Sequence, residues 1–207
     1  IHLAMQAARK GIRSSYASLE MTASECSGRM LANASGVPRP TMQGALTVQH
    51  KTKLADTASS MKAWPITFKD DNKATLEAFG GFLQQQRLEG DLGFAVIDYL
   101  QLLSSPGFES RTQEVSAISR SLKALAMQME IPILALSQLN RSSTRENRKP
   151  SLSDLRESGS IEQDADCVIL LDVEKELGPS KDCIWMNLAK NRNGETGQSY
   201  VSFEKPL

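Results

Sequence analysis

Cysteine is scarce in this 207-residue chain, and the three that occur, Cys26, Cys167 and Cys183, stand far apart with no Cys-x-x-Cys pair. Such spacing argues against a zinc site and against a disulfide framework, and it fits a reducing, intracellular compartment. Excess charge is lacking too, because 24 Lys and Arg residues balance 24 Asp and Glu residues. A formal net charge of zero provides no global field that attracts a polyanion. Any nucleic-acid site therefore has to be local.

Long hydrophobic runs are also missing. The longest, such as residues 167–171, are far below the roughly 18 residues that a membrane-spanning helix needs. No signal-peptide pattern opens the chain. The sequence thus predicts a soluble, cytoplasmic protein without a membrane partner. Because Ile1 already lies in helical-looking sequence, we expect the natural protein to continue upstream.

What the sequence does contain is an alternation of helical and strand-like segments from one end to the other. This order predicts an α/β fold, a mostly parallel twisted sheet with helices on both faces, and the length suits one domain over residues 1–207. The helical patterns cover residues 2–9, 23–34 with Ser24 as N-cap, 47–63, 74–89 and 112–129. The strand-like patterns cover residues 13–19, 65–68, 94–103, 131–136 and 167–171, followed by 184–189 and 199–203. We predict that 94–103, 131–136 and 167–171 are buried strands, and that the last two strands form an antiparallel hairpin at the sheet edge.

Asp98 is the sharpest candidate site residue, because it interrupts the apolar run at 94–103. In such sheets ligands bind beyond the carboxyl ends of the strands. A carboxylate delivered there by an apolar strand is how a motor ATPase holds Mg²⁺, usually through water. The alternative interpretation is an aspartate that caps a turn.

Polar residues also end three other predicted strands. Glu20 could orient an attacking water near the metal, or it could be an ordinary acid at a helix start. Gln138 could sense a γ-phosphate through its amide, although polar strand ends are common. Lys190 and Arg192 share a strand face by their period of two, and such a pair could reach a neighbouring subunit's triphosphate or could simply be solvated.

Two segments could contact a nucleic-acid backbone. Residues 141–149 contain Arg141, Arg145, Arg148 and Lys149 against Glu146 alone, a local excess of three positive charges, although charge runs are usually just solvated. Residues 154–166 place an arginine, small residues and backbone N–H groups just before a helix start, which suits phosphate binding or a plain helix N-terminus. Neither segment contains an aromatic residue, so we expect contacts to the backbone without base stacking.

Six segments in a fixed order carry a resemblance to a known family: SLEM at 18–21, IDYLQ at 97–101, ISRSLKALA at 118–126, ALSQLNR at 135–141, DLRESGSIEQDAD at 154–166 and KNRNG at 190–194. Over nearly its whole length the chain resembles the C-terminal RecA-like motor domain of DnaB-type replicative helicases. The resemblance implies a P-loop NTPase fold, ATP and Mg²⁺ as cofactors, and translocation on single-stranded DNA as a hexameric ring, with a primase and a helicase loader as partners.

The resemblance also implies individual roles. Glu20 corresponds to the catalytic carboxylate, Asp98 to the Walker B aspartate on Mg²⁺, and Gln138 to the residue that couples the nucleotide to the DNA loops. Lys190 and Arg192 correspond to the lysine and arginine finger that a neighbouring subunit supplies. The residues matching the DNA-holding loop are Arg156, Glu157 and Gly159, and Arg141 belongs to the basic loop before it.

The Gly-x-x-x-x-Gly-Lys-Ser/Thr phosphate loop of the family is absent from the sequence. We expect it immediately upstream of Ile1, so that the chain is a motor domain truncated at its N-terminus and also at its C-terminus. Without this loop the chain alone should not hydrolyse ATP usefully. Two alternatives stay open: a recombinase or clock-type ATPase of the same superfamily, which assembles on DNA without unwinding it, and a non-hydrolysing assembly module.

Overall fold

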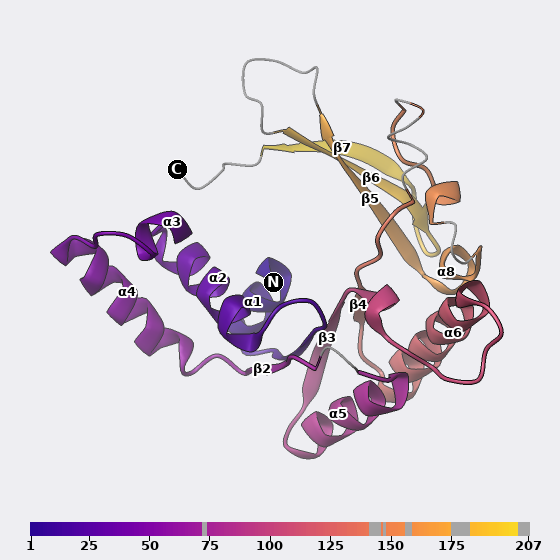
Figure 1. The fold of residues 1–207 in the computed structure, drawn as a ribbon, viewed down its shortest axis with the longest axis horizontal. Helices are drawn as coiled ribbons and strands as arrows, with labels where there is room; N and C mark the ends of the chain where they lie inside the picture. The colour runs from indigo at the N-terminus through magenta and orange to yellow at the C-terminus, as the bar shows by residue number, and fades with distance from the viewer. Residues whose placement is uncertain (72–73, 141–145, 147, 156–158, 175–182, 203–207) are drawn as a thin grey trace. The chain divides into compact units, whose positions relative to one another are not determined.

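The computed structural model describes residues 1–71, 74–140, 146, 148–155, 159–174 and 183–202 (Figure 1). The chain divides into two compact units. Residues 1–105 and 124–136 belong to the first, and residues 106–123 and 137–205 to the second. Each unit is built around its own β-sheet. Within the described residues, no helix is both long and apolar enough to cross a membrane.

The first unit contains a parallel sheet of four strands in the order β2-β1-β3-β4. Its strands are β1 (Arg13–Ser18), β2 (Ile66–Lys69), β3 (Leu92–Asp98) and β4 (Ile133–Ala135). Its helices are α1 (His2–Arg9), α2 (Ala23–Ser35), α3 (Arg39–Met42), α4 (Val48–Met61) and α5 (Leu76–Leu88). Helix α6 (Arg111–Met129) has residues in both units. The expected α/β class and parallel sheet are therefore confirmed.

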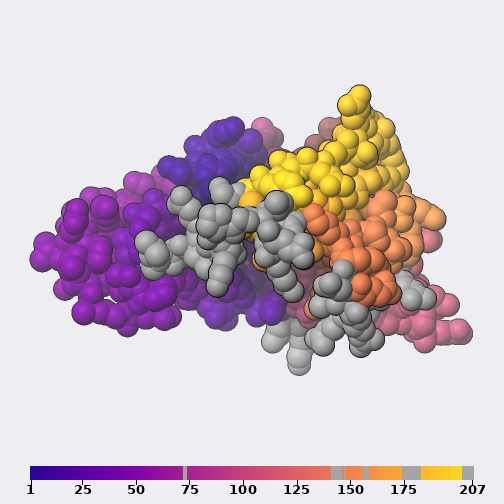
Figure 2. Space-filling view, turned by 90° about the horizontal axis from the view of Figure 1, so that it is seen from above, coloured from indigo at the N-terminus to yellow at the C-terminus, as the bar shows by residue number. Residues whose placement is uncertain are grey.

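Helices cover both faces of this sheet. On one face, Ala4 of α1 and Cys26 of α2 pack with Tyr16 and Val96 of the two central strands. Helix α5 lies on the other side (Figure 1), and its Phe79 is fully buried. Helix α4 packs against α2, yet none of its residues is buried, and purple atoms of this part of the chain are visible on the surface in Figure 2. The core of this unit is thus built on β1 and β3; β3 ends with Asp98, and Glu20 follows β1.

Three local predictions in this unit are wrong. Strand β4 is not buried, because Ile133 and Leu134 are only half-buried and Ala135 is exposed. Helix α2 is capped by Thr22 rather than Ser24, because Thr22 and Glu25 form a reciprocal capping box. Strand β3 ends at Asp98, and the predicted continuation to residue 103 is instead a 3₁₀ helix, η1 (Leu100–Leu102), after a cis Asp98–Tyr99 peptide. Leu100 and Leu103 are buried. The strand therefore ends at the Asp98 carboxylate. The apolar residues that follow it belong to a turn that packs into the core.

The second unit contains an antiparallel sheet, β5 (Cys167–Glu174), β6 (Cys183–Asn191) and β7 (Gly197–Ser202), in that order. A 3₁₀ helix, η2 (Leu152–Asp154), and a short helix, α8 (Gly159–Asp164), precede it. The predicted β6–β7 hairpin is confirmed, but it belongs to this separate sheet and not to the edge of the parallel one. The prediction that residues 167–171 form a buried strand is wrong for one face: Val168 and Leu170 lie in a core with Trp185, whereas Ile169 and Leu171 are exposed.

Candidate functional site

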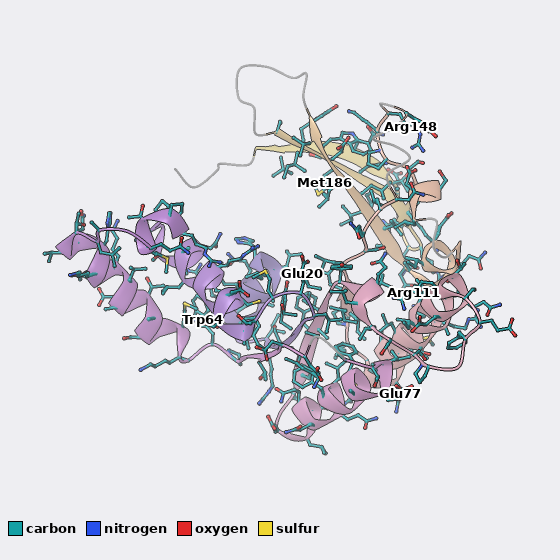
Figure 3. All side chains as sticks on the ribbon, viewed as in Figure 1. Glu20, Trp64, Glu77, Arg111, Arg148 and Met186 are labelled. Carbon is teal, nitrogen blue, oxygen red and sulfur yellow. The ribbon has the colours of Figure 1, made fainter. Side chains whose placement is uncertain are left out.

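Glu20 and Asp98 lie at the carboxyl ends of two adjacent parallel strands. Ser18, the last residue of β1, is in register with Asp98, the last residue of β3. The Leu19 N–H donates to the Asp98 carbonyl oxygen at 2.8 Å, which keeps the two chain ends together beyond the last paired residues. Glu20 follows in the short connection to α2, where it is exposed (Figure 3). The structure thus brings together the two carboxylates that the sequence singled out.

The side chain of Asp98 is held by a residue that the sequence interpretation missed. The Tyr16 hydroxyl donates a hydrogen bond to Asp98 Oδ2, and Tyr16 is only 1% exposed. Burial raises the pKa of Tyr16 well above its usual range, and the hydrogen bond and negative charge of Asp98 raise it further. The phenol therefore stays protonated and remains a donor. Period-two alternation places Tyr16 and Ser18 on one face, but only the register shows that this face carries Asp98.

The amino end of α1 lies near the same carboxylate. Ile1 packs against the core cluster that contains Ala4, Tyr16 and Val96, and Tyr16 donates to Asp98. Backbone N–H groups and the dipole at a helix N-terminus favour an anion such as phosphate. This end of the sheet thus combines a helix start suited to phosphate with a carboxylate suited to a cation.

The donor set fits Mg²⁺ better than a metal held by protein ligands alone. Within the described part of the chain there is no group of three or more His, Cys, Asp or Glu side chains that could hold a metal ion. Mg²⁺ keeps several waters and is usually bound by one or two carboxylates together with substrate phosphates. Asp98, close to the amino end of α1, suits that mode of binding.

Lys190 and Arg192 meet at the carboxyl end of α8. Lys190 Nζ donates to the carbonyl oxygens of Glu162 and Gln163 at 2.5 and 3.1 Å. Arg192 Nη2 donates to the Gln163 carbonyl oxygen at 3.1 Å, and Nη1 donates to Asp166 Oδ1 at 2.9 Å. A helix C-terminus carries partial negative charge, which favours cations there. The two residues thus share a location, as their spacing predicted, and in this chain they cap a helix.

Asp166 connects this cluster to α6. Lys123 Nζ donates to Asp166 Oδ2 at 2.5 Å, and this hydrogen bond is the main reason that the pKa of Asp166 is lowered, with the charges of Arg192 and Lys190 adding to it. Ser119 makes a parallel contact, donating to Asp164 Oδ2 at 2.8 Å. The side chains of Asp166 and Arg192 are each nearly half exposed, so their ion pair contributes little stability and can be exchanged.

Arg148, labelled in Figure 3, links the first predicted DNA-contact segment (141–149) to the start of the second (154–166). Its guanidinium donates to Asp154 Oδ2 and Oδ1 at 2.6 and 2.8 Å, and the Asp154 side chain is only 1% exposed. Arg148 is the main reason that the pKa of Asp154 lies well below its usual range, and Ser151 adds hydrogen bonds. Arg148 also pairs with Glu146, while Lys149 lies over the rings of Trp185 and Tyr200. The charge of Arg148 thus serves the protein's own packing through Asp154 and Glu146.

The structure describes only two of the remaining predicted site residues, Gln138 and Gly159. Gln138 is exposed and lies three residues beyond the end of β4. Gly159 is exposed and opens α8. Arg141, Arg156 and Glu157 lie outside the described residues.

The sequence of the chain is similar to known helicases along its whole length. A family model described as the DnaB-like helicase C terminal domain matches residues 1–207. The replicative DNA helicase DnaB of Geobacillus stearothermophilus is 40% identical over 195 residues, which cover 91% of this chain and 43% of the relative. The replicative DNA helicase DnaB of Mycobacterium leprae is 43% identical over 199 residues, covering 92% of this chain and 32% of the relative. The chain thus spans less than half the length of these curated relatives.

Solved structures show the same likeness. The ATPase domain of G40P superposes with a TM-score of 0.92 at 28% identity, covering 98% of this chain and 75% of the other. A DnaB-like replicative helicase, whose structure was described with its interactions with primase, gives a TM-score of 0.91 at 29% identity, covering 98% and 51%. A KaiC-like protein of Pyrococcus horikoshii gives 0.61 at 15% identity, which shows a shared fold alone. The chain therefore belongs to the DnaB-like helicase C-terminal domain family and has its RecA-like fold.

Proposed function

We propose that the whole protein is an ATP-dependent replicative DNA helicase, and that this chain is its motor domain. The observation that carries the proposal is the pair of carboxylates, Asp98 and Glu20, at the ends of adjacent parallel strands, close to the amino end of α1. Membership of the helicase family supports the same activity. Because one family model spans residues 1–207, we also propose that both compact units work as a single motor domain.

In this proposal the two carboxylates have different tasks. Asp98 holds Mg²⁺, through water, at the end of β3. The bound metal supplies positive charge that neutralises the phosphates of ATP. Glu20 is exposed in the next connection, where it can accept a hydrogen bond from the attacking water and orient it. Gln138, beyond the end of β4, couples the nucleotide to the DNA loops.

Lys190 and Arg192 supply positive charge to the ATP of a neighbouring subunit in the ring. Their present contacts are helix carbonyl oxygens and a half-exposed carboxylate. Contacts of this kind are weak in water, so a triphosphate, with its higher charge, can replace them. The hydrolysis site is then complete only when two subunits meet.

Single-stranded DNA is the proposed track, held by Arg141, Arg156, Glu157 and Gly159. Gly159 opens α8, and the carbonyl oxygens at the other end of this helix bind Lys190 and Arg192. Helix α8 is six residues long. A DNA backbone bound at its start can therefore influence Lys190 and Arg192, which bind the carbonyl oxygens at its other end. This connection gives hydrolysis a physical route to respond to DNA.

The partners follow from the same proposal. A hexameric ring of this chain, a primase and a helicase loader are the expected assemblies, and the cytoplasm, at a replication fork, is the expected location. The solved relative with a TM-score of 0.91 was described together with its interactions with primase, which supports a primase as a partner here.

The proposal is tested by ATP hydrolysis and strand displacement with the whole protein, with and without single-stranded DNA. We expect hydrolysis that DNA stimulates and that Asp98→Asn and Glu20→Gln each reduce by on the order of 100-fold or more. Glu77→Gln is the matched control, because Glu77 is an exposed residue in the first turn of α5, away from Glu20 (Figure 3). Unchanged hydrolysis in Asp98→Asn would refute the proposed site. Hydrolysis without strand displacement would favour a recombinase-like activity.

A further inference from the structure

Tyr16 is a core residue with a polar end. It lies on β1 and is 1% exposed, and its ring lies 5.6 Å from that of Phe68 between centroids. The ring packs in the cluster with Ala4, Cys26 and Val96. A buried tyrosine hydroxyl needs a hydrogen-bond partner, and Asp98 Oδ2 accepts that bond. One end of the side chain is thus fixed by packing, and the other is directed at the candidate metal ligand.

The strand register makes this contact specific to Tyr16. Tyr16 pairs with Val96, so that Asp98, two residues further along β3, lies diagonally ahead on the same face. Ser18 lies directly opposite Asp98, yet its hydroxyl donates to the Met21 carbonyl oxygen at 2.6 Å. The hydroxyl of the residue paired with Asp98 is therefore engaged in the turn, and the tyrosine supplies the donor to the carboxylate.

Asp98 is consequently held at two points. Its carbonyl oxygen accepts from the Leu19 N–H at 2.8 Å, and its carboxylate accepts from Tyr16. If the carboxylate turned away, the buried phenol would lose its acceptor, which is unfavourable. The two side chains therefore keep one arrangement.

We propose that Tyr16 is a positioning residue that orients the Asp98 carboxylate for Mg²⁺. The inference rests on the proposed function, in which Asp98 holds that metal. Because Oδ2 accepts from the phenol, the other carboxylate oxygen, Oδ1, would remain for the metal or its bound water. Partners that orient a metal ligand in this way commonly change metal affinity 10- to 100-fold when they are removed.

The test is Tyr16→Phe in the whole protein. Phenylalanine keeps the ring that packs on Phe68 and removes only the hydroxyl, and thermal unfolding verifies that the core is preserved. Two readouts are followed against Mg²⁺ concentration: ATP hydrolysis and the binding of a fluorescent ADP analogue. We expect the half-saturating Mg²⁺ concentration to rise on the order of 10-fold in both, with ADP binding in the absence of Mg²⁺ unchanged.

Tyr200→Phe is the matched control. It removes the same hydroxyl from a tyrosine of the second unit, whose hydroxyl lies 3.3 Å from Lys149 Nζ. A general loss of a tyrosine hydroxyl would affect both variants equally. We expect Tyr200→Phe to leave the Mg²⁺ dependence unchanged, whereas an equal shift in both variants would overturn the inference.

Asp98→Asn distinguishes the proposed role of Tyr16 from the proposed role of Asp98 itself. If Asp98 holds Mg²⁺, Asp98→Asn raises the Mg²⁺ requirement by itself, and adding Tyr16→Phe to it has no further effect. A normal Mg²⁺ dependence in Tyr16→Phe, together with a shifted one in Asp98→Asn, would overturn the role of Tyr16 and leave the proposed function intact. If Asp98→Asn had a normal dependence, the proposed role of Asp98 itself would fail.

Discussion

Thr22→Ala tests whether the start of α2 positions Glu20. The Thr22 side chain accepts a hydrogen bond from the Glu25 N–H at 3.2 Å, and the Glu25 carboxylate accepts from the Thr22 N–H at 2.9 Å. Replacing a threonine N-cap by alanine typically costs about 1 kcal/mol of stability, which corresponds to a fall in melting temperature of roughly 2–4 °C for a domain of this size. Glu20 lies two residues before this cap, in the connection from β1. Small displacements of a catalytic group are costly, so we expect kcat for ATP hydrolysis to fall on the order of 10-fold.

Thr47→Ala is the control for stability alone. Thr47 caps α4 in the same way, accepting from the His50 N–H at 3.1 Å, and α4 belongs to the exposed part of the first unit. Both variants should lose similar stability in thermal unfolding, while only Thr22→Ala should lose kcat. Equal losses of kcat in the two variants, or an unchanged kcat in Thr22→Ala, would refute the idea that the α2 cap sets the position of Glu20.

Two further predictions concern the second unit. Because the pKa of Asp154 is lowered by Arg148, the stability from this pair is fully present above the ordinary carboxyl pKa and is lost as the pH falls through the lowered value of the folded state. Urea unfolding of Asp154→Asn should therefore show a deficit at pH 7 that shrinks in strong acid, and a deficit independent of pH would contradict this. Arg156→Ala should weaken single-stranded DNA binding equally for different base sequences and make its salt dependence shallower by about 0.7 in logarithmic slope. A loss confined to one base sequence, measured by fluorescence anisotropy, would contradict backbone binding.

Much of the first unit could be predicted from local patterns. Five predicted helices correspond to α1, α2, α4, α5 and α6 within a few residues, because their apolar residues recur with the helical period. The cap of α2 could have been found as well, since Thr22 followed by Glu25 three residues later is the spacing of a capping box. The end of β3 could not have been predicted in this way. Leu100 and Leu103 are buried, and apolar residues are expected after Asp98 both in an extended strand and in a turn that packs into the core.

The candidate site was predictable where one strand carries the signal and unpredictable where two elements have to meet. Asp98 and Glu20 each follow a strand-like segment, so each could be predicted as a site residue from its own part of the sequence. The contact between Tyr16 and Asp98 depends on the register of β1 with β3. The contacts of Lys190 and Arg192 with α8 depend on how a short helix packs beside β6. No periodic pattern in the sequence predicts either arrangement.

Subunit mixing tests the central claim, a hydrolysis site shared between neighbouring copies. Glu20→Gln and Arg192→Ala are each expected to abolish most DNA-stimulated hydrolysis as pure proteins. In a ring assembled from equal amounts of both, about a quarter of the interfaces combine an intact Glu20 with an intact Arg192 from the neighbour. We predict that the mixture regains hydrolysis up to about that fraction of the unmodified protein. A mixture no more active than its components, or an Arg192→Ala protein that is fully active alone, would contradict the shared site.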